Sequence, residues 1–278
     1  MMRKSLVLSV FVLCLSVVGF GQASGQLAGV VKKELSLTDL DRIIKTFTKN
    51  ESLFRRALNE YAFDRSATVQ TIGMGGQVSG VFRRDSFMTF NDAGERFEKI
   101  NFAPISTLTE IGISVADIEN LGGIDPFAIE PKVADQYAFT YIGVEHIDEF
   151  NLYVFDVGPK IVPDAKKGVA KFFQGRIWVD VDDLMIIQTK GKAVPEGKER
   201  FPIVTTIRGS VNNKYYFPIY SSSKGADGTL VFPSGQVVKT TFKVTYKNYR
   251  MGRSDVRILD DDEPANPSPS PTSAPKKP

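Results

Sequence analysis

The chain has 278 residues, of which 42% are hydrophobic, and its 35 Lys and Arg nearly balance 32 Asp and Glu, leaving a formal net charge of +3. Nucleic-acid binding needs a concentrated basic surface, so a weak charge spread along the chain argues against that class. The only cysteine, Cys14, lies near the N-terminus. The chain that follows has no thiol for disulfides, thiolate metal sites or cysteine nucleophiles, and its stability must come from an apolar core.

The N-terminus has the pattern of a secretory signal peptide. Two basic residues precede an apolar run over residues 6–18, which is too short for a stop-transfer helix, and small residues follow. Cleavage after Ala23 or after Gly25 fits this pattern equally well, so residues 1–25 are predicted to be the signal peptide. The protein is therefore expected in the periplasm, soluble or peripheral to the outer membrane.

The C-terminus has the composition of a disordered tail. An acidic block runs from Asp260 to Glu263, and residues 264–278 are mostly Pro, Ser, Ala and Thr. Such a sequence cannot bury enough apolar surface to fold, so residues 259–278 are predicted to be a tail. The folded domain is expected over residues 35–258.

A helix is predicted at the start of this domain, with Ser36 as its N-cap and Asp39 in its first turn. Apolar residues recur at helical spacing on both sides of an interruption at Asn50–Ser52. We expect one kinked helix or two short ones packed against a sheet.

Period-two alternation then predicts strands with turns rich in Gly, Asn and Asp between them. Ser114 is expected to cap a short helix over residues 115–121, which covers the concave face of the sheet or packs against one of its edges. The expected strands cover residues 63–71, 78–90, 95–102, two hairpins between 137 and 187, and then 214–220, 229–232 and 237–249.

The two central hairpins are apolar on both faces. A sheet with one wet face shows polar alternation, so these strands are predicted to be covered on both sides or to line a cavity. Seven of these side chains are candidates for binding an apolar ligand, and half of the seven are expected to be ordinary core. The predicted cavity residues are Phe139, Tyr141, Tyr153, Phe155, Ile177, Val179 and Ile187.

Four segments, TYIGVEHIDEFNLYVFDVGPK, GRIWVDVDDLMIIQTKGKAVP, KYYFPIYSSS and LVFPSGQVVKTTFKVTYKNYR, together resemble the bacterial outer-membrane lipoprotein-sorting (LolA-like) superfamily. The resemblance extends over most of the folded chain. It implies an α+β, mainly β fold: a curved antiparallel half-barrel covered by helices around an apolar cavity for acyl chains of lipoproteins or similar lipids. Arg55, Arg56 and Arg65 are the positions considered for the arginine that locks the lid in these carriers, and the resemblance does not choose among them.

The implied function is non-enzymatic carriage or sensing of lipids or lipoproteins in the cell envelope, with envelope proteins or the membrane surface as further partners. A protein-binding scaffold with the same fold and no lipid cargo is the alternative. The third hypothesis is a hydrolase in which His146, the only histidine, acts as a base or metal ligand beside Glu145 and Asp148. A transition-metal site usually needs several His or Cys ligands, which argues against the metal version. We expect no catalytic residues, no metal and no cofactor. The aspartates at 180, 182 and 183 are interpreted as turn residues, and Trp178 as core.

Overall fold

A computed structural model describes residues 29–114, 117, 128–164, 171–195, 203–223, 229–231, 235 and 237–252. The predicted signal peptide and tail lie outside these residues. So does the predicted helix over 115–121 apart from Asp117, whose backbone N–H and carboxylate both bond to Ser114, as expected of a helix start at that serine.

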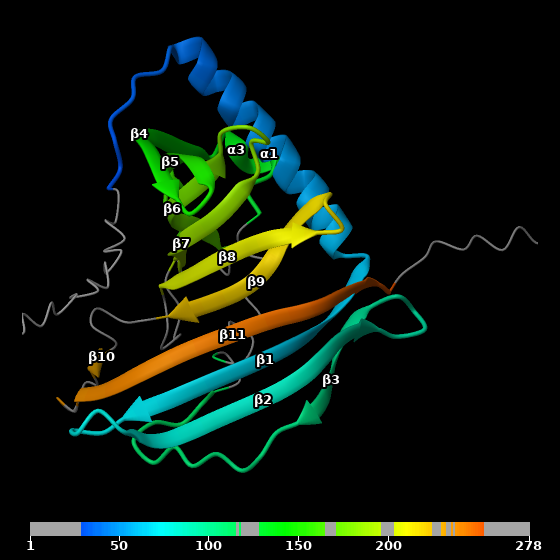
Figure 1. Ribbon diagram of the computed structural model, residues 1–278, viewed down its shortest axis with the longest axis vertical. Helices are drawn as coiled ribbons and strands as arrows, with labels where there is room; N and C mark the ends of the chain where they lie inside the picture. The colour runs from blue at the N-terminus through cyan, green and yellow to red at the C-terminus, as the bar shows by residue number, and fades with distance from the viewer. Residues whose placement is uncertain are drawn as a thin grey trace, which may run out of the picture.

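The described strands form one antiparallel sheet of eleven strands in the order β3-β2-β1-β11-β9-β8-β7-β6-β5-β4, with β10 paired to β11. The sheet is open and strongly curved, and helix α1 (Leu37–Leu58) lies across one of its faces (Figure 1). The predicted α+β, mainly β fold with a curved antiparallel sheet is therefore confirmed. The strands are β1 Tyr61–Ile72, β2 Val78–Phe90, β3 Arg96–Phe102, β4 Tyr137–Ile147, β5 Phe150–Pro159, β6 Phe172–Asp180, β7 Ile186–Val194, β8 Val204–Val211, β9 Tyr215–Ser223, β10 Thr229–Val231 and β11 Val237–Met251.

Helix α1 begins as predicted, because the side chain of Ser36 accepts a hydrogen bond from the backbone N–H of Asp39 at 3.1 Å. Of the two alternatives predicted around Asn50–Ser52, two short helices are wrong, because one helix is continuous over 22 residues. Glu51 breaks the apolar stripe in the sequence, yet it lies on the buried face and is only 2% exposed. Because Glu51 is acidic, its inward position on the helix could not be recognised from the apolar spacing.

Two elements were not predicted. Strand β8 lacks an apolar alternation because its inward positions are occupied by polar side chains, Thr206 and Arg208, which are 9% and 6% exposed. The short helix α3 (Pro131–Ala134) starts with a proline in its first turn, where the missing N–H has no cost.

The face of the sheet beneath α1 carries two apolar clusters. The first, here called the β1–β11 cluster, is built from the end of α1, β1, β9 and β11. The second, the β4–β7 cluster, packs against the first half of α1. The buried members of the β1–β11 cluster are Phe54, Ala57, Leu58, Tyr61, Phe63, Ala67, Val69, Ile111, Phe217, Val238, Phe242, Val244 and Tyr246. Those of the β4–β7 cluster are Ile43, Phe47, Ile129, Tyr137, Tyr153, Phe155, Val157, Phe173, Ile177, Val179, Leu184 and Ile186.

A smaller cluster lies on the opposite face of β5–β7, where Leu152, Val154 and Trp178 alternate with the residues of the β4–β7 cluster. Val30 packs against it, and Val31 exchanges two backbone hydrogen bonds with Val144 at the β4 edge. Gly143 permits this approach: its φ is 153°, and an added Cβ would lie 2.4 Å from the Val31 carbonyl oxygen. Ordered contacts therefore begin before residue 35.

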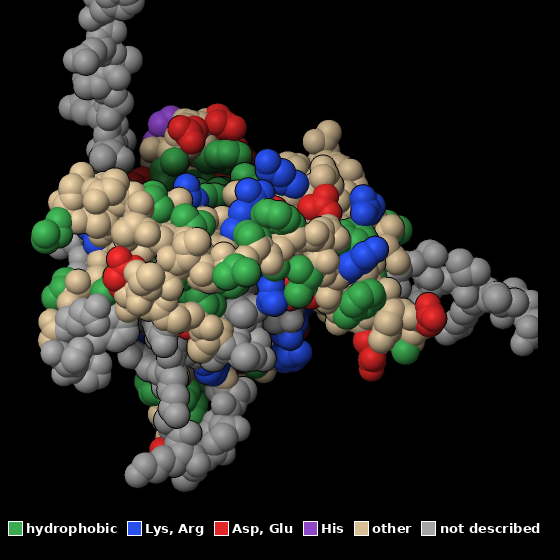
Figure 2. Space-filling model, turned by 90° about the horizontal axis from the view of Figure 1, so that it is seen from below, with side chains coloured by type: hydrophobic (Ala, Val, Ile, Leu, Met, Phe, Trp, Pro, Cys, Tyr) green, Lys and Arg blue, Asp and Glu red, His purple; other side chains and the backbone are tan. Residues whose placement is uncertain are grey.

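The other edge of the sheet is β3, which among the described strands is paired only with β2. Phe97, Ile100 and Phe102 on this strand are 43%, 48% and 51% exposed. Seen from the β2 side, the surface carries Lys and Arg side chains interspersed with hydrophobic ones (Figure 2). No helix in the described part of the chain is long and apolar enough to cross a membrane.

Candidate functional site

The candidate site is the interface between α1 and the curved face of the sheet. The helix presents one apolar stripe to this face, with Ile43 and Phe47 over the β4–β7 cluster and Phe54, Ala57 and Leu58 in the β1–β11 cluster. These side chains are at most 5% exposed, so the helix closes the site in this conformation.

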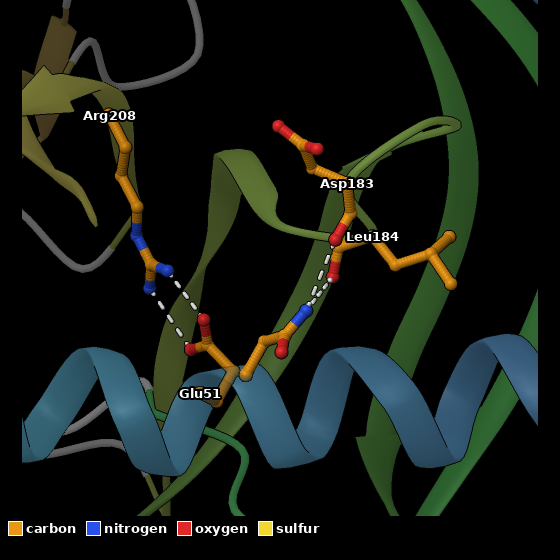
Figure 3. A network of polar contacts seen from close by, with 5 residues as sticks. Glu51, Asp183, Leu184 and Arg208 are labelled. Carbon is orange, nitrogen blue, oxygen red and sulfur yellow. Dashed lines mark hydrogen bonds and ion pairs between the residues drawn. The ribbon is translucent and has the colours of Figure 1, made fainter. Parts of the chain in front are cut away.

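A buried ion pair divides the two apolar clusters. Arg208 on β8 donates to both carboxylate oxygens of Glu51, with N–O distances of 2.5 and 3.1 Å (Figure 3). The guanidinium also lies 3.9 Å above the ring of Phe54, a cation–π contact. A charge in an apolar interior is stable only when it is paired in this way, so the pair fixes the position of α1 over the sheet.

Two further polar contacts hold the same stretch of α1. The side-chain amide of Asn50 donates to the backbone carbonyls of Asp183 and Leu184 in the β6–β7 turn, at 3.2 and 2.9 Å (Figure 3). Arg55 donates to Glu130, just before α3, at 2.8 Å. Helix α1 is therefore attached to the sheet and its loops by polar contacts at its middle and by apolar packing at both ends.

Six of the seven predicted cavity residues come together under α1. Tyr153, Phe155, Ile177 and Val179 are buried members of the β4–β7 cluster, and Phe139 and Tyr141 pack against it. The ring of Phe47 lies 5.6 Å from that of Phe139 and 5.8 Å from that of Phe155, between ring centroids. The side chain of Phe47, from α1, therefore packs among these residues.

The seventh residue, Ile187, is not on this face. Thr189 pairs with Ile177, and simple alternation from Thr189 would point the side chain at position 187 toward α1. In the structure, however, Val179 pairs with Ile186. Ile187 is therefore the extra residue of a β-bulge. Its side chain packs with Trp178 in the cluster on the opposite face, and Ile186 takes the inward position. The bulge arises from strand pairing and has no signature in local alternation.

The hydroxyl of Tyr141 is buried in this region and has no hydrogen-bond partner among the described residues. Burial raises the pKa of this hydroxyl above its ordinary value, so it stays protonated. A polar group of this kind is typical of a place where a ligand atom or a water is expected.

The remaining predicted candidates lie away from the space under α1. His146 is exposed, with its Nδ1 3.2 Å from the side-chain oxygen of Asn151, and the Trp178 indole N–H donates to Glu145 at 2.7 Å. In the part of the chain that the structure describes, no three His, Cys, Asp or Glu side chains are grouped to hold a metal ion. Of the three arginines considered for the lid contact, Arg55 and Arg56 lie on α1 itself, and Arg55 pairs with Glu130 just before α3. Arg65 pairs with Glu98 on β3. The residue that pairs with α1 from the sheet is Arg208.

No family model and no curated protein sequence matches the chain. Among solved structures, a DUF1329 family protein from Desulfovibrio piger is 13% identical over 78% of this chain and 96% of its own, with a TM-score of 0.34. A structure described as an outer membrane lipoprotein-sorting protein domain, from Vibrio parahaemolyticus, is 11% identical over 77% and 95%, with a TM-score of 0.31. The MucA/MucB complex of Pseudomonas aeruginosa gives 10% identity over 77% and 95%, with a TM-score of 0.23. A lipoprotein-sorting domain, the kind of protein that the sequence resembles, is thus among the solved structures similar to this chain.

Proposed function

We propose that the protein is an exported, non-enzymatic binder of lipid acyl chains or lipoproteins, which holds them between helix α1 and the curved sheet. This proposal rests on one observation: α1 packs on two apolar clusters and is held at its middle by the ion pair between Glu51 and Arg208. An acyl chain that displaces α1 replaces one set of apolar contacts with another, so the cost of opening is offset by the ligand.

The residues beneath the first half of α1 are suited to this role. Phe139, Tyr141, Tyr153 and Phe155 form a continuous aromatic surface on β4 and β5, with ring centroids of Tyr141 and Phe155 5.4 Å apart. Such a surface fits flexible hydrocarbon without directional bonds. Displacement of Phe47 would expose this aromatic surface.

We propose further that the protein acts in the periplasm, to which the predicted signal peptide would direct it.

The first experiment is native mass spectrometry with lipid extraction on the mature protein, purified from its own envelope without detergent, followed by titration with a fluorescent fatty-acyl probe. Co-purified lipid or lipoprotein, and saturable probe binding, are the expected results. A clean apo mass together with no probe binding would contradict the proposal.

A pair of variants links binding to the predicted surface. Phe139→Asp places a charge on the inward face of β4 and is expected to weaken probe binding by tenfold or more. The neighbouring Thr140→Asp, at an exposed position pointing to the opposite face, is the matched control and is expected to leave binding unchanged. If Phe139→Asp folds and still binds the probe normally, this face is not the lipid site.

A protein-binding scaffold with no lipid cargo is the second candidate, and two observations favour it. Phe155, Ile177 and Val179 are fully buried, so the β4–β7 cluster is packed solid. The β3 edge exposes backbone groups and Phe97, Ile100 and Phe102, which suits the addition of a partner strand. A clean apo mass with a co-purifying envelope protein would favour this function.

A further inference from the structure

A cluster of charged side chains lies on the inward face of β1, β2 and β3. Arg65 stands between Phe63 and Ala67 on β1, on the same side as these buried residues. Arg84 on β2 is paired with Ala67, and Glu98 on β3 is paired with Met88, which in turn is paired with Phe63. All three charged side chains therefore share the face of the β1–β11 cluster.

Among the described side chains that are paired in this cluster, two guanidinium groups face one carboxylate. Arg65 Nη2 lies 2.5 Å from Glu98 Oε1, and Arg84 Nη1 lies 3.6 Å from Glu98 Oε2. The side chains of Arg65, Arg84 and Glu98 are 5%, 21% and 23% exposed. Two guanidinium groups thus share one carboxylate in a largely buried place.

The nearby aspartates do not compensate this charge, because they belong to the opposite face of the sheet. Asp85 accepts hydrogen bonds from Ser66 and Arg83, and Asp64 accepts one from Asn248. Positions 64, 66, 83 and 85 alternate with the inward ones along β1 and β2. Asp64 and Asp85 thus find their hydrogen-bond donors on the opposite face.

Three polar atoms of the cluster have no hydrogen-bond partner among the described residues: Arg65 Nε, Arg84 Nε and Ser86 Oγ. Ser86 is paired with Arg65 across the β1–β2 ladder, so all three atoms lie on the same face. A buried donor without a partner is costly, and an excess buried charge is more so, unless a ligand supplies the missing acceptor.

We infer that this cluster binds the anionic head group of an amphiphilic ligand, whose hydrocarbon chain lies along the adjacent β1–β11 cluster. A carboxylate or phosphate oxygen accepts charge-assisted hydrogen bonds from Arg65, Arg84 and Ser86 and neutralises the excess charge. The inference rests on the proposed function and narrows it: the ligands are acidic lipids, and neutral ones of the same length bind more weakly.

The test compares three ligands of equal chain length, dodecanoate, dodecyl phosphate and dodecanol, in competition with the fluorescent acyl probe on the whole mature protein. Both anions are expected to bind about tenfold more tightly than the alcohol, the size of effect typical of one hydrogen bond to a charged group. If one anion binds more tightly than the other, its head group, carboxylate or phosphate, is the one that the cluster recognises.

Arg84→Gln is the main variant, because this side chain is less buried than Arg65, and it is expected to bring both anions to the affinity of dodecanol. Ser86→Ala is the second variant and is expected to lower anion affinity by a smaller factor. Arg83→Gln is the matched control: it removes the adjacent cation of β2, which points to the opposite face and pairs with Asp85. This control is expected to keep the preference for anions.

Equal binding of all three ligands to the unmodified protein overturns the inference and leaves lipid binding standing. Loss of the preference in Arg83→Gln, with retention in Arg84→Gln, also overturns it. Binding of none of the three ligands overturns the proposed function, and the inference with it.

Discussion

The two apolar clusters beneath α1 differ in the kind of side chain that fills them. The β4–β7 cluster is aromatic and aliphatic throughout, with Phe47, Phe155 and Ile177 fully buried. The β1–β11 cluster stands next to Arg65, Arg84 and Glu98 and to the Glu51–Arg208 pair. Apolar packing stabilises a fold without selecting a ligand, whereas buried charges cost stability and select one. We therefore assign most of the stability to the first region and most of the specificity to the second.

The largest effect is expected from a cavity in the β4–β7 cluster. Phe155→Ala removes a fully buried ring that contacts Phe47 and Tyr141, and should lower the free energy of unfolding by about 3–5 kcal/mol. Urea unfolding measures this change. Phe97→Ala, on the exposed β3 edge, is the control with an expected change within about 0.5 kcal/mol. A loss below about 1 kcal/mol in Phe155→Ala would remove the distinction between the two regions.

The ion pair between the clusters is expected to give the next effect. Arg208→Met leaves Glu51 buried without a partner and should destabilise the protein by about 3 kcal/mol, while the double variant Glu51→Leu/Arg208→Met should recover most of this loss. The double-mutant cycle, measured by urea unfolding, separates the pair from ordinary packing. Arg55→Met, at a pair that is 40% exposed on the arginine side, should cost about 1 kcal/mol or less. A double variant as unstable as Arg208→Met would show that the site needs the charges for its shape.

The first half of α1 packs on the β4–β7 cluster. A variant at the start of α1 therefore tests how firmly this cluster holds the helix. Ser36→Ala removes the N-cap hydrogen bond to Asp39 and should lower the free energy of unfolding by about 1 kcal/mol. Thr46→Ala, at a half-buried position of the same helix where the hydroxyl donates to the backbone carbonyl of Arg42, is the control. Hydrogen exchange is expected to increase in the first turn of α1 alone. Faster exchange along the whole helix would mean that its two halves do not move independently.

Two tyrosines of the β1–β11 region are expected to have the smallest effect on the free energy of unfolding, and only at alkaline pH. Burial raises the pKa of Tyr246 and Tyr249 above the ordinary value of 10.0. Because the folded state holds these protons more tightly than the unfolded state, their contribution is complete below pH 10 and is lost as pH rises through the folded-state values. The free energy of unfolding should therefore fall above pH 10, and less steeply in Tyr246→Phe. A flat profile to pH 11 in the unmodified protein would contradict this.

The strands of this protein were predictable where polar and apolar residues alternate or where glycine and asparagine mark a turn. The hairpin over β2 and β3 is an example, since Asn91 and Gly94 close its turn with a backbone hydrogen bond. The prediction missed β8 and left open a division of α1 into two helices, and both shortcomings have one physical cause. Glu51 and Arg208 each place a charge at an inward position, and each is tolerated only because the other is there.

Local composition alone determined the antiparallel strands, the helix that covers them and six of the seven side chains expected under it. Tertiary structure decided which of these positions are paired: the contact of residue 51 with residue 208, the β-bulge that turns Ile187 outward, and the grouping of Arg65, Arg84 and Glu98 from three strands. Periodicity is a property of neighbours in the chain, whereas the pairing of a buried charge depends on residues far apart in the sequence. The candidate specificity of this protein therefore became visible only in the folded chain.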